Sequence, residues 1–141
     1  MLTPDAIRLD GRVAVVTGGG AGIGRGVAEG LAAFGASVSI WERDPGRAEA
    51  VADAVGGQAV VVDVRDGDAL DEALAVTVER FGAVDVLVNN AGGTFHAPLL
   101  ETSDGGFDAL HRANLGHVLR CTRRVAAAMV AAGRGGSIVN V

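Results

Sequence analysis

The stretch that most constrains the fold is 13–26, VAVVTGGGAGIGRG. Its first four residues are apolar and predict a buried strand that ends at Thr17, and the amphipathic stretch 23–34 predicts a helix. Glycines stand between the two at 18, 19, 20 and 22, and in the first turn of the predicted helix at 24 and 26. A strand, a glycine turn and a helix in this order open a dinucleotide-binding βαβ unit.

Glycine is needed there for a physical reason. The backbone must turn tightly, approach a pyrophosphate and let the helix lie against the strand, and a Cβ atom obstructs all three. The free N–H groups at the start of the helix then face the phosphates. A glycine-rich turn taken alone is also consistent with a flexible loop, so the rest of the chain must decide.

Strands and helices alternate strictly along the chain. We expect strands at 37–41, 59–62, 84–88 and 137–141, and helices at 45–55, 67–81 and 103–132. Asp44, Asp66 and Ser103 or Thr102 are the expected N-caps. The strands are continuously apolar, which is typical of a sheet covered on both faces. The pattern predicts an α/β, Rossmann-like doubly wound parallel sheet of order 3-2-1-4-5, with ligands at the carboxyl ends of the strands.

Composition narrows the class of protein. The 141 residues suit one domain over 1–141, and a net charge of −5 argues against a nucleic-acid surface. The longest apolar stretch, 125–132, is too short to span a membrane. The single Cys121 excludes an internal disulfide, and His96, His111 and His117 lack metal-ligand spacing and are interpreted as loop and helix-surface residues. With no basic-then-apolar leader pattern, we expect a cytoplasmic protein without metal.

Two motifs together carry a family resemblance. Thr17-Gly18-x-x-x-Gly22-Ile23-Gly24 and Asn89-Asn90-Ala91-Gly92 closely resemble the short-chain dehydrogenase/reductase family. The resemblance implies an NAD(P)-dependent oxidoreductase that transfers hydride between nicotinamide and a small alcohol or carbonyl substrate. It also implies that Thr17, Gly18, Gly22, Ile23 and Gly24 hold the coenzyme.

Glu42 ends the second strand, 18 positions after Gly24. The dinucleotide fold uses an acid about 20 residues on to accept hydrogen bonds from ribose hydroxyls. A carboxylate there repels a 2′-phosphate, and Ala21 stands where NADP-using family members often carry a basic residue, so NAD is favoured over NADP. The alternatives are a surface acid at Glu42, and an Arg43 that meets a 2′-phosphate.

Asp63 and Val64 end the third strand. The resemblance implies that the Asp63 carboxylate and the Val64 N–H contact the adenine. The alternative is that Asp63 caps the following helix, a role for which Asp66 is better placed.

The loop after strand four is rich in small and amide residues. The resemblance implies that the coenzyme is lined by Asn90, Ala91 and Gly92. We expect Asn89 to brace the sheet, with Thr17 as its partner.

Asn114 lies inside the long helix, where asparagine is a mediocre helix former. The resemblance implies a catalytic role, holding a water in a proton relay; a satisfied core amide or an exposed polar position are the alternatives. This helix also carries an apolar stripe wider than one packing face needs, at Leu110, Leu115, Val118, Leu119, Val125, Met129 and Val130. The resemblance implies a homo-oligomer contact through it, and core packing is the alternative.

The resemblance covers the whole chain but only the first part of a family member. The family's catalytic serine follows the fifth strand, and its tyrosine and lysine lie on the next helix, whereas this sequence has no tyrosine and only arginine among its 12 basic residues. Arginine does not give up its proton and cannot replace them. We therefore expect a truncated family member carrying mainly the cofactor-binding half. A non-catalytic dinucleotide-binding or interaction module and a doubly wound methyltransferase are the competing hypotheses.

Overall fold

The computed structural model describes residues 4–141, so the first three residues of the amino-terminal segment lie outside it. Five strands form one parallel sheet in the order β3-β2-β1-β4-β5. Their bounds are β1 Val13–Thr17, β2 Ser37–Glu42, β3 Gln58–Val61, β4 Val86–Asn89 and β5 Ser137–Asn140. The predicted sheet order and parallel pairing are confirmed; the limits of β1 are as predicted, and those of the other strands differ by at most two residues.

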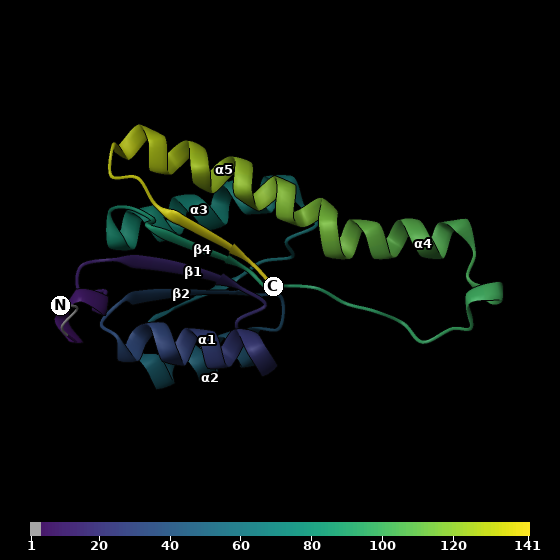
Figure 1. Ribbon diagram of the computed structural model, residues 1–141, viewed down its shortest axis with the longest axis horizontal. Coiled ribbons are helices and arrows are strands. Elements are labelled where there is room, and N and C mark those ends of the chain that lie inside the picture. Colours follow the sequence, from purple (N-terminus) through teal and green to yellow (C-terminus); the bar gives the residue numbers. More distant parts are fainter. Residues whose placement is uncertain (1–3) are drawn as a thin grey trace.

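Helices cover both faces of this sheet (Figure 1). The bounds of the four covering helices are α1 Gly22–Ala33, α2 Pro45–Val55, α3 Gly67–Phe81 and α5 His117–Ala132. Helices α1 and α2 lie on one face, and α3 and α5 lie on the other. Successive strand residues therefore enter different cores: Val16 packs with Ile40 on the α1–α2 side, and Val15 packs with Leu87 on the α3–α5 side.

The helix ends agree with the capping residues in the sequence. Asp44 accepts a hydrogen bond from Arg47 N (3.0 Å), and Asp66 accepts from the N–H groups of the first turn of α3. Helices α2 and α3 end at Gly56 and Gly82, both with positive φ.

The long helix predicted over 103–132 is interrupted. Ser103 caps α4 (Asp104–His111), a π turn η3 (Arg112–Gly116) follows, and α5 continues from His117. At the interruption the Asn114 amide donates to Leu110 O (2.9 Å), so a side chain competes for a helical backbone acceptor. Single-turn π segments of this kind are frequent at functional sites.

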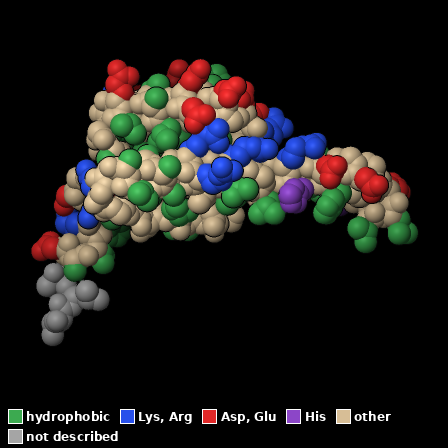
Figure 2. Space-filling model, turned by 90° about the horizontal axis from the view of Figure 1, so that it is seen from above, with side chains coloured by type: hydrophobic (Ala, Val, Ile, Leu, Met, Phe, Trp, Pro, Cys, Tyr) green, Lys and Arg blue, Asp and Glu red, His purple; other side chains and the backbone are tan. Residues whose placement is uncertain are grey.

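Helix α4 and the loop that precedes it extend beyond the sheet as an arm (Figure 1). Short 3-10 turns occur in this loop, η2 (Leu99–Glu101), and at the amino end, η1 (Pro4–Ile7). Figure 2 shows hydrophobic side chains gathered along the arm. Leu99 and Leu100 on the arm are 86% and 97% exposed, whereas the sheet core is buried.

His117 is not a surface residue, so that interpretation of the sequence is wrong. It is 1% exposed and precedes Cys121 by four residues, which places it on the inner stripe of α5 with Cys121, Val125 and Met129. Within residues 4–141 neither ring nitrogen has a hydrogen-bond partner. Burial lowers the pKa of His117 and raises the pKa of the Cys121 thiol to about 11.

Asn89 braces the sheet, but the predicted partner is wrong. Its Nδ2 donates to Asn140 Oδ1 (2.8 Å) on β5 and to Thr122 Oγ1 (3.1 Å) on α5. The parallel register places Asn89 beside Asn140, which sequence spacing did not reveal. The hydroxyl of Thr17 serves the next two residues of the loop instead.

Candidate functional site

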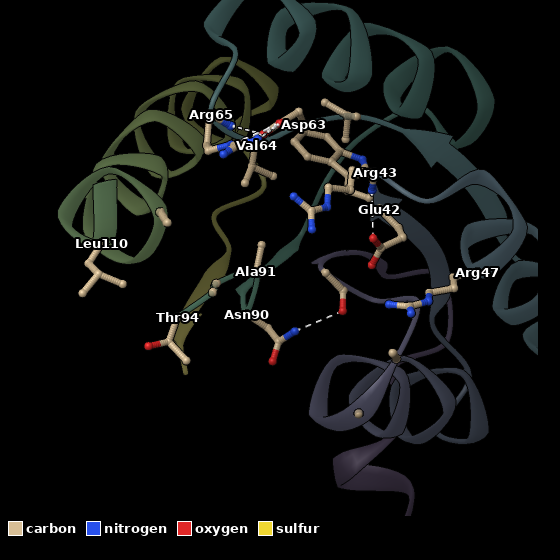
Figure 3. Close-up of a pocket in the computed structure, with 18 of the residues that line it drawn as sticks. Glu42, Arg43, Arg47, Asp63, Val64, Arg65, Asn90, Ala91, Thr94 and Leu110 are labelled. Atoms are coloured by element: carbon tan, nitrogen blue, oxygen red, sulfur yellow. Dashed lines mark hydrogen bonds and ion pairs between the residues drawn. The ribbon is translucent and has the colours of Figure 1, made fainter. Parts of the chain in front are cut away.

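An open cleft of about 580 Å³ lies at the carboxyl ends of the strands. Its walls come from the β1–α1 turn, the ends of β2 and β3, the loop after β4, and α4 with the start of η3 (Figure 3). This is the position at which open α/β sheets bind ligands, and the volume lies in the range of small-molecule sites.

The glycine turn between β1 and α1 forms one wall of the cleft, and it packs so closely against the loop after β4 that side chains at two of its positions would not fit. Gly18 has φ +62°, and a Cβ there would lie 2.9 Å from Ala91 Cα. A Cβ on Gly24 would run into the Gly18 carbonyl oxygen and the Asn90 amide nitrogen. The turn and the loop after β4 are thus packed backbone to backbone, which leaves room for a ligand close to the chain.

Hydrogen bonds lock that contact. Thr17 Oγ1 accepts from the backbone N–H groups of Asn90 and Ala91, both at 3.0 Å, and donates to Val88 O (3.3 Å). In return, Asn90 Nδ2 donates to Thr17 O (3.0 Å) and Gly18 O (3.2 Å). The two motifs that carry the family resemblance are therefore one hydrogen-bonded unit.

The amino end of α1 opens toward this wall. Its N-cap is Ala21, which has no side chain able to satisfy the first N–H groups of the helix. Gly22 has φ +53°, and a Cβ built on it would meet no heavy atom within 4 Å. Uncapped N–H groups and the positive end of the helix dipole favour an anion such as a phosphate.

Glu42 is held in a fixed orientation at the end of β2. Its Oε2 accepts from Gly20 N (3.2 Å), and its Oε1 accepts from the N–H groups of Arg43 (3.0 Å) and Asp44 (3.2 Å). Arg43 and Arg47 also line the cleft, beside this carboxylate. One carboxylate and two guanidinium groups thus share the part of the cleft nearest β2.

Asp63 and Arg65 form a forked ion pair in the wall after β3 (Figure 3). The Arg65 side chain, acting first through hydrogen bonds, lowers the pKa of Asp63 to about 2. Val64, between them, is buried and belongs to the α3–α5 core.

Asn114 fixes the loop after β4 to the π turn. Its Oδ1 accepts from Gly93 N (3.1 Å), and its Nδ2 donates to Gly93 O (2.8 Å) and Leu110 O. A Cβ on Gly92 would lie 2.8 Å from Asn114 Oδ1. Both hydrogens of the amide and its oxygen are thus engaged in shaping this wall.

The residues singled out in the sequence separate into three groups. Those that line the cleft are Gly18, Gly22, Glu42, Arg43, Asp63, Val64, Asn90, Ala91 and Gly92. Thr17, Gly24 and Asn114 stand behind the wall and hold it, and Ile23 is 67% exposed outside it.

Sequence reasoning assigned no role to three further lining residues: Trp41, Arg47 and Arg65. Trp41 is 1% exposed, and its Nε1 donates to Oγ1 of Thr77 on α3 (3.1 Å). Trp41 could have been identified from the sequence, because it lies at the end of a strand, one residue before Glu42. The two arginines lie on helical and loop positions where a charge normally faces water.

Within residues 4–141 no group of three metal-ligating side chains occurs. No helix in the same range has the length and apolarity required to cross a membrane.

Comparison with known proteins shows the family to which the chain belongs. The family model described as short chain dehydrogenase matches residues 12–141. The chain belongs to the short-chain dehydrogenase family. Members of this family bind NAD(P), in keeping with a cleft built from these two motifs.

Individual relatives agree with this membership. The short-chain dehydrogenase is 39% identical to sorbitol dehydrogenase of Cereibacter sphaeroides and 39% identical to L-xylulose reductase of Bos taurus, each over 96% of this chain and 54% of the relative. A solved structure of 7 alpha-hydroxysteroid dehydrogenase, complexed with NADH and 7-oxo glycochenodeoxycholic acid, superposes with a TM-score of 0.92 at 34% identity. That match covers 100% of this chain and 56% of the other. The chain spans about half the length of the relatives it matches.

Proposed function

We propose that this short-chain dehydrogenase binds NAD and serves the transfer of hydride between nicotinamide and an alcohol or carbonyl carbon, the chain supplying mainly the coenzyme-binding half. The observation that carries the proposal is the side-chain-free turn at Gly18 and Gly24, clamped by Asn90 at the uncapped amino end of α1. A Cβ on Gly18 or Gly24 would force the turn and the loop after β4 apart, and a Cβ on Gly22 would stand in the open cleft where a diphosphate would lie, so the residues present fit a dinucleotide.

Each wall would hold a different part of the coenzyme. The N–H groups of Gly22, Ile23 and Gly24 at the start of α1 would bind the diphosphate. Asn90, Ala91 and Gly92 would lie along the nicotinamide side. The nicotinamide supplies the hydride chemistry when bound, and the chain's own residues orient it and exclude water.

Glu42 supports NAD over NADP. Its carboxylate is fixed by three backbone N–H groups and lies in the cleft, where ribose hydroxyls can donate to it and a 2′-phosphate is repelled. Arg43 and Arg47, which also line the cleft, favour the competing assignment to NADP.

Asn114 would contribute to catalysis indirectly, by holding the loop after β4. Its amide is engaged by Gly93 and Leu110, so its proposed contribution is to keep the loop after β4 in place beside the reacting carbon. We also propose a homo-oligomer contact through the long helix, supported by Leu115, Leu119 and Val130, which are 57%, 60% and 81% exposed.

Titration with NADH and NADPH tests the coenzyme assignment. The protein contains one tryptophan and no tyrosine, and Trp41 lines the cleft, so quenching of its emission reports binding. We expect Glu42→Ala to weaken NADH binding about tenfold or more, since hydrogen bonds to a charged group are lost, and to leave NADPH binding unchanged or improved. Glu79→Ala, at an exposed position on α3, is the control for charge. Equal weakening of both coenzymes by Glu42→Ala contradicts the ribose assignment.

A second candidate, a dinucleotide-binding module without turnover, is favoured by the absence of tyrosine and lysine from the sequence. Assaying this chain for NAD reduction with sorbitol distinguishes it. NADH binding with no turnover supports the module for the chain alone, and turnover would show that the reaction proceeds without a tyrosine or lysine proton donor.

A further inference from the structure

Arg65 is tied to Asp63 more tightly than to any other described residue. Its Nε donates to both Asp63 oxygens (2.9 and 3.1 Å), its second guanidinium nitrogen donates to Oδ2 (2.5 Å), and its own backbone N–H donates to Oδ1 (3.0 Å). These hydrogen bonds therefore restrict the rotation of the Asp63 carboxylate and pair its negative charge with a guanidinium.

The pair has no evident task in folding. The N-cap of α3 is Asp66, so Asp63 is not needed there. The Asp63 and Arg65 side chains are 38% and 54% exposed, and exposed ion pairs contribute little to stability. Both residues line the cleft, and Figure 3 shows the ion pair between them.

A carboxylate held this way still accepts hydrogen bonds. Its two oxygens offer about four acceptor positions, and Arg65 directs only three N–H groups at them, because the Nε hydrogen is shared between both oxygens. An aspartate carboxyl is ionised at neutral pH, and the fork lowers its pKa further, so the group has no proton to donate. A ligand atom that meets it must therefore be a donor, such as the exocyclic amine of a 6-aminopurine.

We propose that Arg65 is a positioning residue that fixes Asp63 to accept a hydrogen bond from the 6-amino group of the coenzyme base, and thereby selects adenine over a 6-oxopurine. This inference rests on the proposed function, since it requires a dinucleotide in the cleft. A 6-oxo group would turn an acceptor toward the fixed carboxylate and would be repelled.

The test compares NADH with reduced nicotinamide hypoxanthine dinucleotide, which carries oxygen in place of the 6-amino group. Trp41 quenching gives both dissociation constants. For the wild-type chain we expect NADH to bind about tenfold more tightly, as for one hydrogen bond to a charged group. In Arg65→Leu we expect the preference to fall to about twofold or less, mainly through weaker NADH binding. Arg65→Lys should restore part of it, because lysine keeps the charge without the fork.

Arg47→Leu is the matched control, because it removes an arginine from another wall of the same cleft. It should change both dissociation constants by a similar factor and leave their ratio intact. If Arg65→Leu does not fold, Arg65→Gln is used, because it keeps a polar side chain of similar length without the fork, and the preference should fall in the same way.

The outcomes separate this inference from the proposed function. An Arg65→Leu chain that keeps the wild-type ratio, or a wild-type chain that binds both dinucleotides equally, overturns the role of Arg65 while NAD binding stands. A wild-type chain that binds neither dinucleotide overturns both.

Discussion

Replacing Gly24 by alanine perturbs the coenzyme turn at a single atom. Gly24 lies in the first turn of α1, and the added Cβ would enter the Gly18 carbonyl oxygen and the Asn90 amide nitrogen. The first is backbone, and the second is held by its own hydrogen bonds. Neither can move aside as the flexible end of a side chain would, so the turn and the loop after β4 must separate.

The magnitude follows from a matched variant on the same helix. At Gly26 a Cβ would meet no heavy atom within 4 Å, so Gly26→Ala should stabilise the protein by about 0.5–1 kcal/mol through helix propensity. Gly24→Ala gains the same propensity term but suffers overpacking, which costs about 1–3 kcal/mol. The difference in unfolding free energy between the two variants is therefore the clash itself, about 1–3 kcal/mol.

Urea unfolding followed by the emission of Trp41, the only tryptophan, measures this difference. We expect a lower midpoint for Gly24→Ala, a higher one for Gly26→Ala and a common m-value. NADH quenching should be weakened in the first variant and retained in the second. A Gly24→Ala protein as stable as Gly26→Ala, with unaltered NADH binding, would refute the argument that the turn excludes side chains.

Two further perturbations address buried polar groups. Burial holds the pKa of His117 in the folded protein below its ordinary value of 6.5, so as the pH falls the unfolded chain binds a proton before the folded one does. The free energy of unfolding should therefore decrease as the pH drops below 6.5. Urea titrations from about pH 7.5 to 5 should show a flatter pH dependence for His117→Leu. An unchanged slope in that variant would assign the pH dependence to other groups. Asp85, 3% exposed, accepts from Val13 N (2.9 Å), Arg12 (3.1 Å) and Arg134 (3.1 Å) at the amino edge of the sheet. Asp85→Asn should cost about 1–3 kcal/mol, short of a fully buried pair because both arginines reach water, and an unshifted urea midpoint would contradict it.

Local patterns were enough for the elements and their order. Continuous apolar runs set the strands, Asp44 and Asp66 set the starts of α2 and α3, and Gly56 and Gly82 set their ends. These features depend on a residue and its near neighbours, so they can be read in a line of sequence. The sheet order followed because parallel βαβ units cross over with one hand.

Contacts between distant segments could not be read in this way. His117 is buried because α5 turns that face to the sheet, and Asn89 meets Asn140 because β4 and β5 run in one register. The π turn at Asn114 breaks a helix whose periodicity looked uninterrupted.

The sequence by itself determined the fold, the family resemblance and the glycine turn, because each depends on residue type at a fixed spacing. Only the tertiary structure decided how the turn is clamped by Asn90, which arginines enter the cleft, and that Arg65 grips Asp63. Side-chain direction at a strand end or in a loop depends on packing between elements far apart in the chain, and no local pattern contains it.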